Sequence, residues 1–229
     1  TKICIPKSVI EISDNAFENC FSISEIIIPK SVTQIGCKAF SGCESLINIS
    51  IPQSVTFIGK KCFSGCSKLI QFLIPTSITK ISDSTFESCS SLKTIDFPSS
   101  IESIGFKAFS KCSSLTHVFI PKTIKEICEN AFEYCRYLKI IAMTLSFDPE
   151  FIGIQNNEKV EFYKDESEVL FKLSKKFENG EGVPVDTGLS IKYLKMSVDN
   201  GNSEALFKYG TMFYNNSGVL DNKKYAAKY

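Results

Sequence analysis

A single pattern recurs six times at a constant spacing of 23 residues, and it limits the possible fold more than any other feature of the sequence. One copy runs from Ile28 to Ser50 as IPKSVTQIGCKAFSGCESLINIS, and the copies continue to about Met143. A fixed period between 20 and 29 residues is typical of a stacked solenoid, in which each unit is too short to bury its own apolar face. Three residue types keep the period without a slip: Pro6, Pro29, Pro52, Pro75, Pro98 and Pro121; Phe17, Phe40, Phe63, Phe86, Phe109 and Phe132; and Cys20, Cys43, Cys66, Cys89, Cys112 and Cys135.

Each repeat is predicted to contain a strand, a proline turn, a second short extended piece and one helical turn. The segment Ile49-Ser50-Ile51 alternates as a strand does, with its first and third residues facing the core. Proline ends the strand because it fixes φ and cannot donate to a ladder. The KAFSGC piece is predicted to close with a helical turn that places Phe40 and Cys43 in the core.

Two further columns carry predictions about hydrogen bonds and bends. Gly36, Gly59 and Gly105 are expected to mark the bend after the second extended piece. A column of hydroxyl groups follows each proline and is expected to bond neighbouring backbone groups. Its members are Ser8, Ser31, Ser54, Ser77, Ser100 and Thr123.

The chain contains 10 cysteines, of which six form one column of the repeat. Neighbouring strands of a parallel stack lie about 4.8 Å apart, whereas a disulfide requires Cβ atoms about 3.8 Å apart. The column is therefore interpreted as free, buried thiols that pack as small hydrophobes. Metal binding is the alternative, but Cys62 and Cys66 have no second pair at zinc spacing and the chain has 1 His. No metal and no cofactor are expected.

Charge and hydropathy exclude some classes of partner. The net charge is +1, which gives no electrostatic footprint for nucleic acid. The sequence holds no run of 18 apolar residues, so no membrane insertion is expected. Because Thr1 already stands inside a repeat, and the chain stops partway through a predicted helix at Tyr229, we expect the protein to continue at both ends. The compartment, cell surface or cytoplasm, and the oligomeric state stay open.

The repeat resembles the leucine-rich repeat variant of BspA-like surface proteins from anaerobic bacteria and parasitic protists. The residues that carry the resemblance in one copy are Leu46, Ile49, Ile51, Pro52, Ser54, Val55, Ile58, Gly59, Phe63 and Cys66. It implies a leucine-rich repeat solenoid over residues 1–145, with a parallel sheet on its concave face. It also implies protein binding, often as an adhesin, and it brings no catalytic residue with it.

The outward residues of the strands are the candidate site for a protein partner. They vary from repeat to repeat while the core columns stay fixed, and apolar side chains exposed among them are typical of interaction sites. Single exposed apolar residues are also normal, and a second domain could cover these. His117 is read as a solvent-facing strand residue, because no serine or cysteine motif accompanies it. The two columns are Glu25, Asn48, Gln71, Thr94, His117 and Ile140, and Ile27, Ser50, Leu73, Asp96, Phe119 and Ala142.

A second repeat of 36 residues begins after Asp165: Leu170-Phe171-Lys172 returns as Leu206-Phe207-Lys208. Apolar spacings of three and four predict helices, and Asp186 is a candidate N-cap. The pattern resembles Sel1-like repeats, relatives of tetratricopeptide repeats, and implies a short α-solenoid of helix–loop–helix units. Serine replaces the usual small residues at Ser174, Ser190 and Ser197. The matching residues are Phe177, Gly180, Gly182, Val183, Asp186, Tyr193, Gly201, Asn202, Ala205, Tyr209, Gly210, Phe213, Gly218 and Val219.

The predicted organisation is therefore mixed α and β, in three parts. Residues 1–145 form the leucine-rich repeat solenoid, residues 146–165 a cap and linker, and residues 166–229 about two helical repeats. The leading functional hypothesis is a non-catalytic protein-interaction module or scaffold. The alternatives are a cell-surface adhesin for host protein or glycan, and a non-catalytic recognition arm of a larger signalling enzyme. No residues form a catalytic constellation, so an enzyme is not expected.

Overall fold

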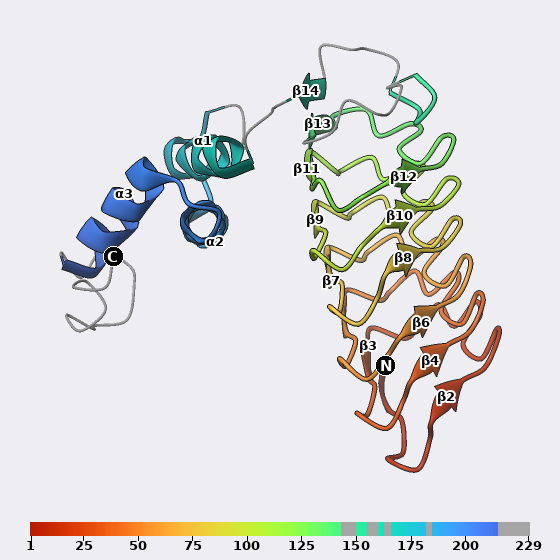
Figure 1. Cartoon of the computed structure of the whole chain (residues 1–229). Coiled ribbons are helices and arrows are strands. Elements are labelled where there is room, and N and C mark those ends of the chain that lie inside the picture. Colours follow the sequence, from red (N-terminus) through yellow and green to blue (C-terminus); the bar gives the residue numbers. More distant parts are fainter. Residues whose placement is uncertain (143–149, 155–159, 163–165, 182–184, 215–229) are drawn as a thin grey trace. The chain divides into compact units, whose positions relative to one another are not determined.

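The computed structural model describes residues 1–142, 150–154, 160–162, 166–181 and 185–214. The chain divides into two compact units, Thr1–Phe162 and Tyr163–Tyr229, shown in red to green and in teal to blue in Figure 1. The first unit is a β-solenoid and the second holds three helices. No helix among the described residues is long and apolar enough to cross a membrane.

Two series of short strands run along the first unit (Figure 1). The first strands of the coils are β1 (Lys2–Cys4), β3 (Glu25–Ile27), β5 (Asn48–Ser50), β7 (Gln71–Leu73), β9 (Thr94–Asp96) and β11 (His117–Ile120), followed by β13 (Lys139–Ala142) and β14 (Val160–Phe162). The second strands are β2 (Glu11–Ile12), β4 (Gln34–Ile35), β6 (Phe57–Ile58), β8 (Lys80–Ile81), β10 (Ser103–Ile104) and β12 (Glu126–Ile127). All printed pairs are parallel, in the sheets β1-β3-β5, β7-β9-β11-β13-β14, β2-β4-β6 and β8-β10-β12.

The register follows the sequence period through β11 and then departs from it. Gln71 pairs with Thr94, 23 residues on. His117 instead pairs with Lys139, and Val118 with Ile140, an offset of 22. The placement of Ile140 and Ala142 in the outward columns was therefore wrong, because a one-residue slip exchanges the two faces of a strand. The last pairing, Ile140 with Val160, is shorter again, at an offset of 20.

A ladder of phenylalanine rings runs through the core. Phe17 and Phe40 stack with ring centroids 5.3 Å apart, and the same contact continues to Phe132 with interplanar angles of 2–11°. Each repeat places its ring on that of the repeat before, so the core consists of contacts between neighbouring coils. The five rings after Phe17 are fully buried.

The cysteine column lies beside this ladder, and all ten cysteines are free, as predicted. From the second repeat on, each column thiol also donates a hydrogen bond to the carbonyl of the phenylalanine 26 residues earlier. Burial raises the pKa of the Cys43 thiol to about 11, and it raises the pKa of Cys89 well above its usual value. The donors are Cys43, Cys66, Cys89, Cys112 and Cys135, at 3.1–3.2 Å.

The predicted helical turn in KAFSGC is wrong. Lys38 and Gly42 both have left-handed φ angles, +54° and +73°, and such residues interrupt a right-handed helix. Alternate amides instead bond in two directions: Phe40 N–H reaches the carbonyl of Cys62 in the next coil at 2.9 Å, whereas Cys43 N–H closes a turn on Phe40 at 3.2 Å. The segment is thus a series of tight turns bonded to the neighbouring coil.

The glycine and hydroxyl columns occupy their predicted places. A Cβ on Gly59 would lie 2.4 Å from the backbone nitrogen of Cys37, so the coils approach too closely for a side chain there. Four serines each donate to the carbonyl oxygen 22 residues earlier at 2.5–2.7 Å: Ser31, Ser54, Ser77 and Ser100. Thr123 departs from this column, because its Oγ1 is buried and makes no hydrogen bond with any residue the structure describes.

Residues 150–154 continue the first unit beyond the sixth repeat. Phe132 N–H donates to the carbonyl of Ile152 at 2.9 Å, and the Ile152 and Ile154 side chains are buried in the solenoid core. Strand β14 then extends the sheet, so the unit continues to Phe162. The rest of the predicted cap and linker, residues 143–149, 155–159 and 163–165, lies outside the described residues.

The second unit contains α1 (Glu166–Asn179), α2 (Thr187–Asp199) and α3 (Ser203–Tyr214). Asp186 caps α2 as predicted, since its Oδ1 accepts from the amide of Leu189 at 2.9 Å. The Ser197 hydroxyl donates to the carbonyl of Ser167 at 2.5 Å, so a serine in place of a small residue bonds across the α1–α2 contact. Gly182, Val183, Gly218 and Val219 lie outside the described residues.

Candidate interaction surface

We call the outward side of the first strands the strand face. Alternation within each strand turns one residue to the core and its two neighbours outward. Six of the ten candidate residues are exposed, three are half-buried and one is buried. In that order they are Glu25, Ile27, Asn48, Ser50, Gln71 and Leu73; Thr94, Asp96 and His117; and Phe119.

Two apolar side chains stand out on the strand face. Leu73 is 73% exposed and Ile27 is 45% exposed. Both end their strands at equivalent positions of the repeat, two coils apart, with Ser50 in register beside Ile27. At about 4.8 Å per coil, the two positions lie roughly 10 Å apart. They provide apolar contact area without contributing to the core.

Phe119 does not belong to this exposed set. It is 7% exposed, so the prediction that it lies in solvent was wrong. Exposure decreases along the strand face from β7 to β11, where His117 is half-buried instead of open to solvent. A strand residue is buried on its outward side only where other atoms pack over the sheet. The accessible part of the strand face therefore runs from β3 to β7.

Few charges lie on this accessible part. The carboxylate of Glu25 binds Nζ of Lys2 in the preceding strand at 2.8 Å, and this hydrogen bond raises the pKa of Lys2. Asn48, Ser50 and Gln71 are neutral and exposed. Their side chains can donate and accept hydrogen bonds at the rim of the apolar pair, as interface rims do.

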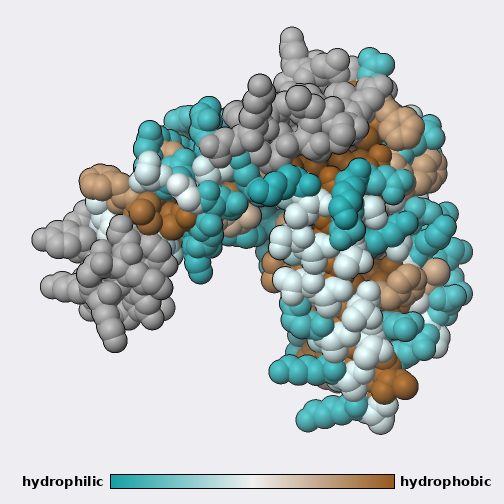
Figure 2. Space-filling model, viewed as in Figure 1, coloured by the Kyte–Doolittle hydropathy of each residue, from teal (hydrophilic) through white to brown (hydrophobic). Residues whose placement is uncertain are grey.

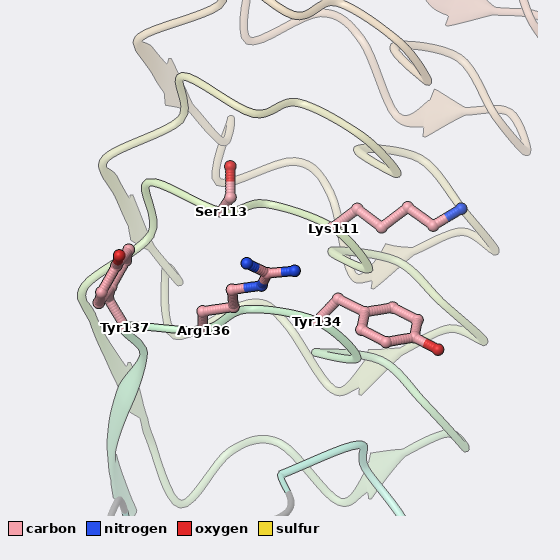
Figure 3. A pocket seen from close by; sticks show the side chains of 5 residues that line it. All are labelled: Lys111, Ser113, Tyr134, Arg136 and Tyr137. Atoms are coloured by element: carbon pink, nitrogen blue, oxygen red, sulfur yellow. The ribbon is translucent and has the colours of Figure 1, made fainter.

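A second feature of the solenoid was not predicted from the sequence. A pocket of about 630 Å³ opens on the flank where the chain returns from the turns toward β13. Figure 3 shows the Arg136 side chain in the middle of the group, with Ser113 and Lys111 on the preceding coil and the two tyrosines on either side of it. The lining residues are Lys111, Ser113, Tyr134, Arg136 and Tyr137.

A signal for this pocket exists in the sequence. In the column of Tyr137 the other repeats carry four serines and Lys68, and in the column of Arg136 they carry Ser67, Ser90 and Ser113. The sixth repeat alone brings several large side chains together here. Figure 2 shows the visible flank of the solenoid covered mainly by hydrophilic and intermediate residues, with small hydrophobic areas between them.

Nothing on these surfaces resembles a metal centre. Within the described ranges, no three His, Cys, Asp or Glu side chains form a group that could hold a metal ion. Cys62 and Cys66 are buried in the core, and burial raises the pKa of both thiols.

Comparison with known families identifies the repeat. The family described as BspA type leucine rich repeat region matches residues 1–144 in six copies. A search of the curated proteins gave no match.

Solved structures agree on the fold of the first unit. A leucine rich repeat protein of T. pallidum is 31% identical with a TM-score of 0.60, over 62% of this chain and 69% of that chain. A leucine-rich repeat protein of Eubacterium ventriosum is 23% identical with a TM-score of 0.52, over 65% of this chain and 44% of that one. A protein of Faecalibacterium prausnitzii described as a leucine rich cell surface protein is 23% identical, with a TM-score of 0.42, over 68% of this chain and 63% of that one. The chain thus spans less than two thirds of the last two.

Proposed function

Because the chain belongs to the BspA-type leucine-rich repeat family, we propose that it is a non-catalytic protein-interaction module that binds its partner through the strand face. The observation that carries this proposal is the exposure of Leu73, at 73%, within a column whose neighbours toward the core are buried. A leucine kept in solvent adds nothing to folding, whereas a partner that covers it gains apolar burial.

The surrounding side chains are consistent with a protein partner. Ile27 and Leu73 supply an apolar centre, and Asn48, Ser50 and Gln71 surround it with neutral polar groups. Interfaces commonly combine an apolar centre depleted of charge with a polar rim. A rigid stack of parallel strands also keeps these side chains in fixed positions, which lowers the entropy lost on binding.

The test compares partner capture by the parent chain and by an Ile27→Glu, Leu73→Glu double variant. Charges at these two positions would be left desolvated beneath a partner, so capture should fall by at least tenfold. The matched control is Ile10→Glu, which places the same charge on an apolar side chain that is 69% exposed away from the strand face. Equal capture by the parent and the double variant would refute the strand face as the site. Phe119→Glu is unsuitable, because a buried glutamate would destabilise the fold.

We further propose that the three helices are Sel1-like repeats that extend the scaffold. The arguments in favour are the Asp186 cap and the contact of Phe177 with Tyr193, whose rings stack with centroids 5.6 Å apart. Ala205 and Tyr209 are buried beside Phe171 and Leu194. If these residues form the repeat core, Tyr193→Ala should lower the thermal stability of residues 163–229, whereas Phe207→Ala, at a fully exposed site of the same unit, should not.

Placement at the cell surface is the form of this function that the resemblance to BspA-like surface proteins favours. It predicts that a protease added to intact cells removes the chain. Full protection under conditions that digest a known surface protein would place the interaction inside the cell.

A further inference from the structure

We propose that the pocket between the fifth and sixth repeats is a second binding site that takes an acidic segment of a protein partner. It rests on the proposed function only in that the ligand is a protein. It uses a different surface, the flank, and none of the strand-face residues. Its lining holds two cations, Lys111 and Arg136, two tyrosines and one serine, and no carboxylate.

The conformation of Tyr134 separates this pocket from the ordinary repeat. Tyr134 has φ of +59°, and its column otherwise contains Asn19, Gly42, Gly65, Ser88 and Lys111. A bulky side chain is disfavoured in that region, and residues held there cluster at ligand sites. Yet Tyr134 is 55% exposed and the neighbouring Tyr137 is 72% exposed. Their rings therefore gain little burial in return for the disfavoured backbone, and stability of the fold does not explain them.

The charges indicate the chemistry of the ligand. Arg136 reaches into the middle of the pocket (Figure 3), and a guanidinium can bind a carboxylate through two parallel hydrogen bonds. Lys111 lies 3.8 Å from Glu87 of the preceding repeat, and both side chains are in contact with solvent. That distance exceeds a hydrogen bond, so the ammonium keeps donors for a second carboxylate.

The aromatic residues and the open shape favour a peptide over a small anion. Tyrosine and arginine are the residue types most often found at the energetic centres of protein interfaces. Both tyrosines stand at the sides of Arg136 (Figure 3) and can cover the apolar atoms of a bound chain while the cations bind its carboxylates. The acidic segment would thus be held by charge at its centre and by ring contact at its edges.

The experiment selects ligands from a library of random 12-residue peptides displayed on phage, with the whole chain as bait. We expect the selected peptides to be enriched in aspartate and glutamate relative to the unselected library. Arg136→Ser should weaken binding of a selected peptide by about tenfold or more at 0.15 M salt, because a hydrogen bond to a charged group is lost. The weakening should shrink as salt rises.

Serine is the natural replacement at these positions. Ser113 and Ser90 occupy the column of Arg136, and each hydroxyl reaches the carbonyl of the preceding coil at 3.3–3.4 Å. Arg136→Ser and Tyr137→Ser should therefore fold normally. The control Lys68→Ser removes one positive charge from the same column as Tyr137, but in the third repeat. It should leave peptide binding unchanged.

Three results would overturn the proposal: selected peptides without an excess of acidic residues, equal loss of binding in Lys68→Ser and Arg136→Ser, or unchanged binding in Arg136→Ser. A sulfated hexasaccharide that binds the same pocket while no acidic peptide does would assign the site to a glycan instead. The Ile27→Glu, Leu73→Glu variant should bind the selected peptides as the parent does, so failure of the strand face and failure of the pocket give different outcomes.

Discussion

The thiol of Cys89 donates a hydrogen bond to the carbonyl oxygen of Phe63 at 3.1 Å, although 26 residues separate them in the sequence. The same carbonyl also accepts the amide of Cys66 at 3.1 Å. The cysteine of one coil is thereby tied to the turn of the coil before it. A thiol in this position is both a packing residue and a donor, and it is removed from solvent.

The first prediction concerns the chemical reactivity of the cysteines. Because the thiolate is the reactive form, the raised pKa of Cys89 and the pKa of about 11 at Cys43 should make the buried column inert at pH 8. Cys4 is exposed and should be alkylated first. Mass spectrometry after timed treatment with N-ethylmaleimide measures each site. Modification of Cys89 as fast as Cys4 in the folded protein would contradict the prediction, and unfolding in urea should equalise them.

The second prediction separates two reasons for a glycine. Gly59→Ala should cost about 3 kcal/mol or more, because its Cβ would overlap the backbone of Cys37 at 2.4 Å and the coils would have to separate. Gly65→Ala should cost only about 1 kcal/mol, since its φ of +74° is disfavoured for alanine but the nearest atom is 3.6 Å away. Urea denaturation of both variants compares the two costs. Similar losses would show that close approach is not what requires Gly59.

The third prediction follows from the orphan hydroxyl of Thr123. Its column mate Ser100 donates to the carbonyl of Ile78 at 2.7 Å, whereas Thr123 Oγ1 is buried and forms no hydrogen bond within the described structure. Serine lacks the γ-methyl group and can turn its hydroxyl toward the carbonyl of Ile101. Thr123→Ser should therefore raise the free energy of unfolding by about 1 kcal/mol. The reverse change, Ser100→Thr, should lower it, and a loss of stability in both variants would contradict this account.

The fourth prediction concerns acid stability. Asp83 hydrogen-bonds Lys60 at 2.7 Å and accepts the amide of Phe106 at 3.2 Å, and the lysine holds the pKa of this carboxyl below its usual 3.8. A carboxyl whose pKa is lowered on folding stabilises the fold above its unfolded pKa, and that contribution is lost as pH falls through the folded value.

The Asp83→Asn variant tests this contribution, because asparagine can still accept the amide of Phe106. Its stability should be lower than the parent's by the same small amount between pH 5 and pH 7, since the pair is partly in solvent. The difference should vanish below pH 3.8. A difference that persists at pH 3 would assign the effect to packing instead of charge.

The repeat period was enough to predict the core. The columns of Phe63, Cys66 and Leu69 are fully buried, because a stacked coil places equivalent residues in equivalent surroundings. The same reasoning could not predict the turn conformation. Lys38 and Lys61 adopt φ of +54° and +56° without glycine, since hydrogen bonds to the next coil hold them there.

The end of the solenoid was harder to predict. Leu138 keeps the 23-residue period and is buried, so no core column reports that β13 pairs one residue out of register. The burial of Phe119 arises at the same end, where the stack no longer repeats. The strand face was therefore predicted correctly where neighbours on both sides are regular repeats, from Glu25 to Leu73.

The phenylalanine ladder has a mechanical consequence. Because each ring stacks only on the coils directly before and after it, a pulling force on the end of the solenoid is borne by one contact between coils at a time. Coils under tension would peel away singly, and each would release 23 residues of slack, roughly 80 Å of extended chain. The first unit can therefore lengthen in equal steps and shorten again as rings restack, like a spring with six identical turns.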